Sequence, residues 1–473
     1  TSSFNQLESF LTRRSVAISE NLPPLSLDAV AAQIPRNGVL IEYVRYQPLD
    51  SSAPLSGNFD GTGSSLSFPG SNWLAANNFG APRYAAYLLF SDGRVEAVDL
   101  GDAAEIDAAI QSFTRLLQDQ RADFRSRGND ATISVQVNPE QVENTANHIR
   151  SLIYDPIASY LSDREHLLIS PDSQLNLLPF EAVQTEDGRY LVEQYQVSYL
   201  NSGRDLLRLG TIESSNAAAV VLADPDYDLA VASGSMSMGE VSSELRQFRV
   251  EALPGTEREA EALRSILPNA DILTGSSATE EALKQVQSPS ILHIATHGFF
   301  LENQVIPASN NILTTANAGE VRAFPGVEVA VENPLLRSGL ALAGFNQRGS
   351  GIEDGVFTAL EAANLNLSGT QLVVLSACDT GLGDITNGEG VYGLRRAFAI
   401  AGAETQLISL WQVSDDGTES LMTRYYENLM AGMSRSEALR DLQLEMIRSE
   451  GRYSHPYYWS AFILTGDWRP MTF

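Results

Sequence analysis

The chain has 473 residues, 43% of them hydrophobic and 8% aromatic, a composition typical of a globular protein large enough for two domains. The 31 Lys and Arg against 59 Asp and Glu give a formal net charge of −28, which disfavours nucleic acids and anionic membranes as partners; it favours basic partners or serves solubility. A single cysteine excludes an internal disulfide and favours a reducing, cytoplasmic location, and no apolar run is long enough to span a bilayer.

Residues 1–209 combine helical and strand patterns. The dipeptide Asp92-Gly93 between two strand-like segments predicts a tight hairpin. No group in this part suggests chemistry, and His148 and His166 are expected to be structural. In chain order, we expect a helix at 7–20, strands at 39–46, 84–90 and 95–100, helices at 103–122 and 139–161, and strands at 166–170 and 195–200.

From residue 210 to 473, strand and helix patterns alternate regularly. Such alternation indicates a parallel sheet with helices on both faces, so the predicted fold class is α/β. We expect two domains, one over 1–209 and one over 210–473. The expected strands cover 217–222, 271–274, 291–296, 338–343, 372–378, 405–411 and 458–464, and the expected helices cover 256–267, 279–286, 358–364, 390–401, 416–431 and 435–449.

Two of these strands end at reactive side chains. One apolar run leads to Cys378, the chain's single cysteine, and another leads to His297 and Gly298. In open α/β sheets, ligands bind at the carboxyl ends of the strands. A thiol beside an imidazole at that edge makes a nucleophile–base pair, in which the imidazole takes the thiol proton and later protonates the leaving amine. The alternative is that Cys378 is an apolar filler of the core.

Two neighbours of His297 extend the pattern. Gly298 has no Cβ, so its backbone can approach a substrate carbonyl, and its N–H and that of Cys378 are candidate oxyanion donors. On a helix, His293 and His297 would form a metal-ligand pair, but this segment is predicted to be a strand, and neither a metal nor another cofactor is expected. His293 is either a support for the site or a hydrogen-bonded core residue.

Short motifs in a fixed order extend this pattern over about residues 165–467. They are Ser170-Pro171-Asp172, Leu178-Pro179-Phe180-Glu181, the segments 293–298, 374–381, 388–391, 394–398, 401–403 and 409–415, and His455-Pro456-Tyr457-Tyr458-Trp459. With these motifs the chain resembles the CHAT family of caspase-like cysteine peptidases, which is related to caspases, gingipains and separases. The resemblance implies a caspase-like sheet flanked by helices over 210–473, with a smaller α/β, pseudo-caspase region before it.

The resemblance also implies an activity. A member of this family with an intact dyad, here His297 and Cys378, is a cysteine endopeptidase that cleaves a protein through a thioester acyl-enzyme. Separases carry a similar Leu-Trp-x-Val-x-Asp segment, and its acidic residue, which receives a P1 arginine, matches Asp415. Asp379 is the alternative acid for the S1 pocket, and capping of the following helix is the competing role for Asp415.

The expected partners are a protein or peptide with a basic cleavage site (Arg or Lys) and a regulatory protein. Glu389 and Trp411 are expected to support the site, although Trp411 also suits a core. Two other classes remain open: a latent or non-catalytic caspase-fold signalling or scaffold module, and another Cys–His acyl hydrolase or transferase that needs no acidic S1 pocket.

Overall fold

The computed structural model describes residues 25–49, 79–125, 139–230, 248–301, 305–306, 329–330, 334–348, 353–376, 389–411 and 415–472. Within these residues the main sheet has eleven strands. They are β1 (Gly38–Tyr46), β2 (Arg83–Phe90), β3 (Val95–Asp102), β4 (His166–Ser170), β5 (Gln196–Tyr199), β6 (Val220–Pro225), β7 (Asp271–Gly275), β8 (Ile291–Ala295), β14 (Leu372–Leu375), β15 (Thr405–Ser409) and β16 (Phe462–Gly466).

The helices flank this sheet, and short strands lie beside it. The helices are α2 (Leu27–Ala31), α3 (Ala103–Arg125), α4 (Pro139–Ile153), α5 (Asp155–Ala158), α6 (Leu191–Gln194), α7 (Pro254–Ile266), α8 (Glu280–Lys284), α9 (Ala359–Ala362), α10 (Glu389–Ala401), α11 (Asp415–Met430), α12 (Arg435–Arg448) and α13 (Pro456–Trp459). A small antiparallel sheet contains β9 (Gly298–Phe300), β12 (Ser338–Ala341) and β13 (Val356–Thr358), and β10 (Val305–Ile306) pairs with β11 (Val329–Ala330).

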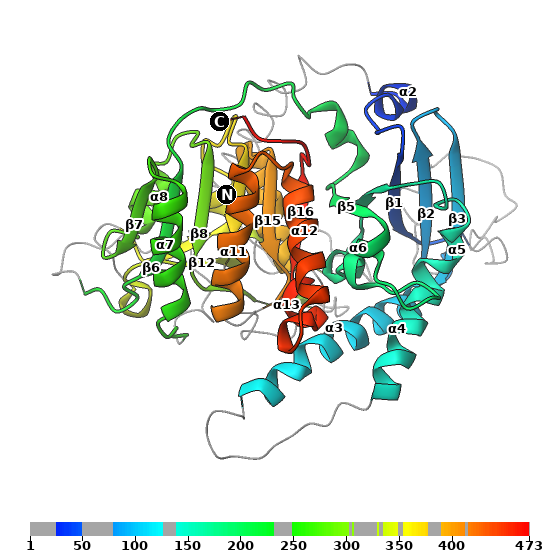
Figure 1. Ribbon diagram of the computed structural model, residues 1–473, viewed down its shortest axis with the longest axis horizontal. Helices are drawn as coiled ribbons and strands as arrows, with labels where there is room; N and C mark the ends of the chain where they lie inside the picture. Colours follow the sequence, from blue (N-terminus) through cyan, green and yellow to red (C-terminus); the bar gives the residue numbers. More distant parts are fainter. Residues whose placement is uncertain are drawn as a thin grey trace, which may run out of the picture.

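The main sheet has the order β3-β2-β1-β4-β5-β16-β15-β14-β8-β6-β7 (Figure 1). At one end, β1, β2 and β3 form an antiparallel meander, and β4 and β5 continue parallel to β1. At the other end, β15, β14, β8, β6 and β7 are all parallel. The two ends meet where β5 runs parallel to β16 with one register pair, Thr465 and Tyr199.

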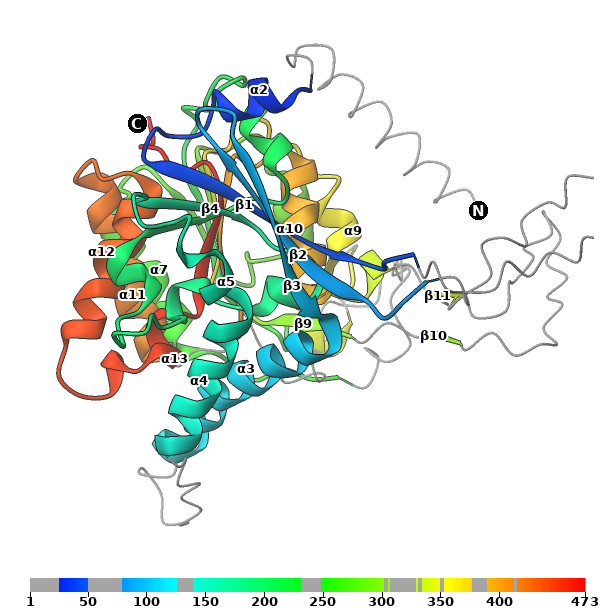
Figure 2. The same ribbon diagram turned by 90° about the vertical axis from the view of Figure 1, so that its right-hand side faces the viewer.

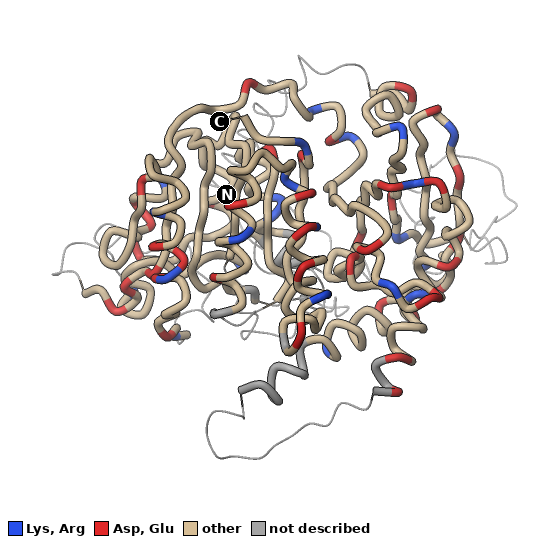
Figure 3. Tube along the Cα trace, viewed as in Figure 1, with Lys and Arg blue, Asp and Glu red and all other residues tan. Residues whose placement is uncertain are grey.

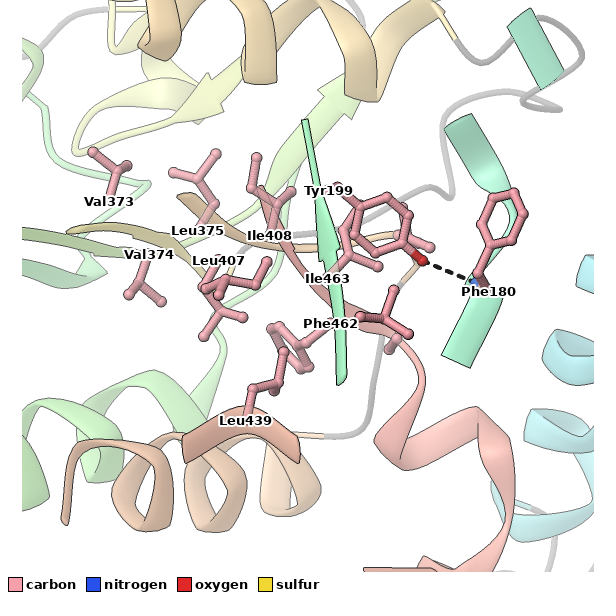
Figure 4. Close-up of a cluster of buried hydrophobic side chains, with 14 of the residues drawn as sticks. Phe180, Tyr199, Val373, Val374, Leu375, Leu407, Ile408, Leu439, Phe462 and Ile463 are labelled. Atoms are coloured by element: carbon pink, nitrogen blue, oxygen red, sulfur yellow. Dashed lines mark hydrogen bonds between the residues drawn. The ribbon is translucent and has the colours of Figure 1, made fainter. Parts of the chain in front are cut away.

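Helices cover both faces of the parallel strands. Figure 2 shows α7, α11 and α12 on one side of the sheet and α9 and α10 on the other. The predicted α/β class is therefore confirmed, and its physical basis is the fully buried, continuously apolar character of strands such as β8 and β14. Figure 4 shows side chains of β14, β15 and β16 packed together with Leu439 of α12 in this core.

The core continues across the meeting point of the two ends. Tyr199 of β5 lies in the same cluster, and its hydroxyl accepts a hydrogen bond from the backbone N–H of Phe180 at 2.9 Å (Figure 4). Figure 3 shows acidic residues spread over the elements at both ends of the sheet. The part of the chain described by the structure contains no helix with the length and apolar character for crossing a membrane.

One predicted strand was wrong at its start. The segment expected as a strand over 458–464 begins with the helical turn α13, and β16 starts at Phe462. The turn forms because Pro456 occupies its first position and the His455 ring accepts a hydrogen bond from the N–H of Tyr457 at 3.2 Å. The same strand, β16, is antiparallel to β15, so the alternation pattern predicted more parallel pairing than the sheet has.

Candidate active site

The strands that lead to His297 and Cys378 are direct neighbours. In the parallel pair of β8 and β14, His293 lies opposite Val374, and the N–H of Ser376 donates to the carbonyl of Ile294 at 3.1 Å. In the sequence, His297 follows His293 by four residues and Cys378 follows Val374 by four residues. The two reactive residues therefore follow matched positions of paired strands at the carboxyl edge, where an α/β sheet binds ligands.

His297 is held in a defined orientation. Its side chain is 5% exposed, and its Nε2 lies 2.7 Å from the backbone carbonyl oxygen of Glu251. A carbonyl oxygen only accepts, so Nε2 carries the proton and Nδ1 is the basic nitrogen of the neutral ring. The ring of Tyr227, which follows β6, lies 5.4 Å away between centroids, and the Tyr227 and Thr296 hydroxyls are hydrogen-bonded at 2.9 Å. The ring is therefore held by a backbone acceptor on one side and an aromatic contact on another.

The Glu251 carbonyl is itself fixed by a buried amide. The Asn346 side chain accepts from the N–H of Val250 at 3.0 Å and donates to the carbonyl of the same residue at 3.0 Å. It also donates to Asp228 at 3.0 Å, which joins the segment after β6 to the segment before α7. Because Asn346 is 6% exposed, its two bonds to Val250 are shielded from water and hold the residue next to Glu251 in place.

The ladder position of Gly298 fixes the direction of its N–H. This residue pairs with Leu340 in the antiparallel ladder of β9 and β12. The neighbouring ladder bonds run from Ala341 N to His297 O at 2.8 Å and from Leu301 N to Arg337 O at 2.7 Å. Bonded and non-bonded pairs alternate along such a ladder, so Gly298 occupies a non-bonded position and its N–H points away from β12.

The structure describes some of the other residues predicted from the sequence and leaves others outside the described part. Trp411 is buried after β15, and its indole N–H donates to the carbonyl of Tyr457 at 3.1 Å, which is a core role beside the site. β15 lies beside β14, as the S1 prediction requires. Glu389 and Asp415 are the first residues of α10 and α11, so α11 begins one residue before the expected start at 416. Cys378, Asp379 and the side chains of Glu389 and Asp415 lie outside the described residues.

His293 is fully buried and contacts Glu259 of α7 and Tyr426 of α11. Sequence reasoning missed Glu259, together with Tyr227, Asn346 and the Glu251 carbonyl. The sequence did carry a signal for Tyr227, because it follows the carboxyl end of a strand, and for Glu259, because it lies one helical turn before the buried Leu263.

The fold and the site define a mixed α/β protein with a large, mostly parallel sheet between helices and with candidate reactive residues at its carboxyl edge. The sequence matches the CHAT domain over residues 143–467. The chain therefore belongs to the CHAT domain family.

Two curated relatives carry the name Tetratricopeptide repeat protein 28. The Homo sapiens protein is 26% identical over 314 residues, and the Mus musculus protein is 25% identical over 313 residues. Each match covers 64% of this chain, and the chain spans only 12% of each relative's length.

Two solved structures share parts of the fold at low identity. The separase of the Saccharomyces cerevisiae separase–securin complex matches with a TM-score of 0.42 and 10% identity, over 96% of this chain and 31% of that one. The Arg-specific cysteine proteinase gingipain R matches with a TM-score of 0.34 and 8% identity, over 72% of this chain and 70% of that one. Both TM-scores lie below 0.5, so no property of these proteins is carried over to this chain.

Proposed function

We propose that this protein is a cysteine endopeptidase with a His297–Cys378 dyad. The observation that carries the proposal is the orientation of His297. This residue follows β8, which pairs with the strand that leads to Cys378, and its Nε2 donates to the Glu251 carbonyl. A general base needs one ring nitrogen fixed by a hydrogen bond so that the other nitrogen can take a proton, and this contact provides that.

The reaction follows from the hydrogen bond of His297, in which Nε2 is the donor. Nδ1 takes the proton of the Cys378 thiol, and Sγ attacks the scissile carbonyl carbon to form a tetrahedral oxyanion. The oxyanion collapses to a thioester as the protonated ring gives its proton to the leaving amine. Water, deprotonated by the same Nδ1, then attacks the thioester and releases the acid and the thiol.

The N–H groups of Gly298 and Cys378 are the proposed oxyanion donors. The ladder position of Gly298 supports this role, because its N–H is directed away from β12. A donor of this kind contributes roughly 3–4 kcal/mol to the barrier reduction.

We further propose that the substrate is a protein cleaved after Arg or Lys, with Asp415 as the S1 acid and Asp379 as its alternative. The adjacency of β15 and β14 supports Asp415, because α11 begins at this residue just beyond β15. A carboxylate in such a pocket binds a guanidinium through two charge-assisted hydrogen bonds. The relatives' name refers to tetratricopeptide repeats, and we propose a regulatory protein partner, with proteolysis controlled by that partner.

The deciding experiment compares fluorogenic peptides with Arg, Leu or Asp at P1, incubated with wild type and with Cys378→Ala. We expect turnover of the arginyl peptide by wild type and none by the variant. Turnover that persists in Cys378→Ala contradicts the mechanism. A wild type that turns over no peptide, alone or with a partner, supports the non-catalytic caspase-fold module instead.

A further inference from the structure

Beneath the ends of β8 and β14, polar side chains from four different elements meet in one cluster, here called the buried clamp. Its members are Glu259 of α7, His293 of β8, Ser376 directly after β14, and Tyr426 of α11. Glu259 is 2% exposed, and His293 and Tyr426 are 0% exposed, so these three lie inside an otherwise apolar core, whereas Ser376 is half-buried at its edge.

Glu259 contacts two of the other members. Its Oε2 accepts a hydrogen bond from the Ser376 hydroxyl at 3.2 Å, and its Oε1 lies 2.9 Å from Nε2 of His293. The second contact is close but not aligned as a hydrogen bond, so its attraction is mainly electrostatic. One carboxylate therefore contacts both a side chain of β8 and the residue that follows β14.

Tyr426 completes the clamp from the other helix. Its hydroxyl lies 3.0 Å from Nδ1 of His293, and the two rings are tilted by 57°. Burial is the main cause that raises the pKa of Tyr426 well above its ordinary value, so the hydroxyl keeps its proton and can donate to the ring. The helices α7 and α11 that carry Glu259 and Tyr426 lie side by side in both views (Figures 1 and 2).

Each of the four elements leads into a different part of the proposed site. β8 continues to His297, and Ser376 is two residues from Cys378. α7 begins three residues after Glu251, whose carbonyl accepts from His297, and α11 begins at Asp415. A cluster that joins these four segments therefore links the segments that carry His297, Cys378 and Asp415.

Stability alone does not account for a carboxylate in this place. Moving an ionised carboxylate into a protein interior costs several kcal/mol, and apolar replacements of buried ion pairs are often neutral or stabilising. The sheet around the clamp already consists of Val, Leu and Ile side chains that pack without such a cost.

We propose that Glu259 is a positioning residue, which holds Ser376 and with it the start of the Cys378 segment in register with His297. The proposal rests on the proposed peptidase function and extends it to residues that do not touch substrate. Since about 1 Å of misplacement at a reacting group costs on the order of 100-fold in rate, a hydrogen bond this close to the nucleophile has a large effect.

The test is a double-mutant cycle with Ser376→Ala and Glu259→Gln. The first removes the donor, and the second keeps the size of the side chain but leaves one acceptor for two donors. We expect each single variant to lower kcat on the arginyl peptide roughly 10- to 100-fold with KM within about twofold. The double variant should be about as slow as the slower single variant, because both changes break one link. Ser376→Thr keeps the hydroxyl and should retain most of the activity.

A second readout does not depend on peptidase activity. The chain has one cysteine, so the rate of iodoacetamide alkylation reports on Cys378 alone. The alkylation rate should shift in both single variants and not further in the double variant. Ser198→Ala is the matched control, because Ser198 is a buried strand serine whose hydroxyl contacts His166 at 3.0 Å far along the sheet.

The outcomes separate the two proposals. Additive effects in the double variant, or Ser376→Ala matching Ser198→Ala in both readouts, overturn the clamp. If wild type cleaves no peptide while alkylation still depends jointly on Glu259 and Ser376, the clamp stands and the proposed activity fails. Should Glu259→Gln not fold, the comparison of Ser376→Ala with Ser376→Thr still decides, since only the first loses the hydroxyl.

Discussion

The two ends of the sheet each bury a histidine on a parallel strand, but they surround it differently. At the antiparallel-meander end, His166 of β4 contacts the Ser198 hydroxyl at 3.0 Å and the edge of Trp468. Burial lowers the pKa of His166 to about 4, so the ring is neutral at neutral pH. At the parallel end, His293 of β8 instead lies 2.9 Å from the carboxylate of Glu259.

The difference shows how to separate a structural histidine from one beside a site. A neutral ring beside a hydroxyl is inexpensive to bury, and β4 leads to no candidate reactive group. A carboxylate beside a buried ring is costly, and here it lies under the strand ends that lead to His297 and Cys378. Partner type, rather than burial, distinguishes the two regions.

The largest expected effect is a difference between two histidine variants. His297→Ala at the parallel end should lose catalysis, whereas His166→Ala at the meander end should lose stability. His297→Ala should lower kcat/KM on the arginyl peptide by on the order of 10³-fold or more, because it removes half of a unit that acts together. His166→Ala should leave kcat/KM of the folded protein unchanged and lower Tm, because it opens a cavity against Trp468. Steady-state kinetics and thermal melts of both variants check this. Equal losses of activity in His297→Ala and His166→Ala would contradict the assignment of different roles to the two histidines.

A smaller effect concerns acids that follow strand ends in the two regions. Asp415→Ala should lower kcat/KM for the arginyl peptide by about 30- to several-thousand-fold, since an unpaired buried charge costs about 2–5 kcal/mol. The same variant should affect a leucyl peptide much less. Asp172, which follows β4 and accepts from the N–H of Arg45 at 2.8 Å, provides the control. If Asp379→Ala loses arginine cleavage and Asp415→Ala does not, the S1 acid is Asp379.

The next prediction concerns stability against pH and the buried carboxyl group of the meander end, Glu181. Burial raises its pKa from 4.5 to about 7, and the Tyr199 hydroxyl, which donates to it at 2.5 Å, opposes that rise. Folding therefore favours the neutral carboxyl, and this contribution is complete below pH 4.5 and is lost as pH rises through 7.

Glu181→Gln should remove this loss and raise the unfolding free energy at pH 8 by about 3 kcal/mol relative to wild type. Denaturant titrations between pH 4.5 and 8 measure it. A variant whose stability relative to wild type stays constant over this range contradicts the assignment.

The smallest effect is expected at the amide that fixes the acceptor of His297. Asn346→Ala removes both hydrogen bonds to Val250, so the Glu251 carbonyl is held less firmly. We expect kcat to fall about 5- to 10-fold with KM nearly unchanged. Asn364→Ala is the control, because this exposed amide bonds only the carbonyl of Leu360 among the described contacts. If Asn346→Ala keeps the wild-type kcat, the Asn346 amide does not contribute to the orientation of His297.

The sequence predicted the fold well where apolar runs are bounded by turn residues. β4 was expected at 166–170 and lies there, and the hairpin at Asp92-Gly93 joins β2 and β3. The pattern failed at Tyr458 and Trp459, because aromatic residues suit a strand and a buried helical turn equally. Strand direction was overstated for β16, since alternation does not encode it.

The site was predicted only as far as side chains carry a signature. The neighbouring strands of His297 and Cys378 followed from their apolar runs and the family resemblance. The Glu251 carbonyl could not be found, because any residue supplies the same acceptor. Glu259 could not be assigned, because a charged residue on the inner face of α7 has meaning only once His293 and Ser376 are known to lie against it.

The single register pair between β5 and β16 has a consequence for cooperativity. Side chains do most of the joining there: the Arg440 guanidinium donates to the carbonyls of Val192 at 2.9 Å and Glu193 at 3.2 Å. We propose that the segments 1–209 and 210–473 unfold as separate cooperative units, with this seam as the line along which the sheet opens first. The continuous sheet would then behave as two foldons joined by side-chain packing and hydrogen bonds rather than by a long strand ladder.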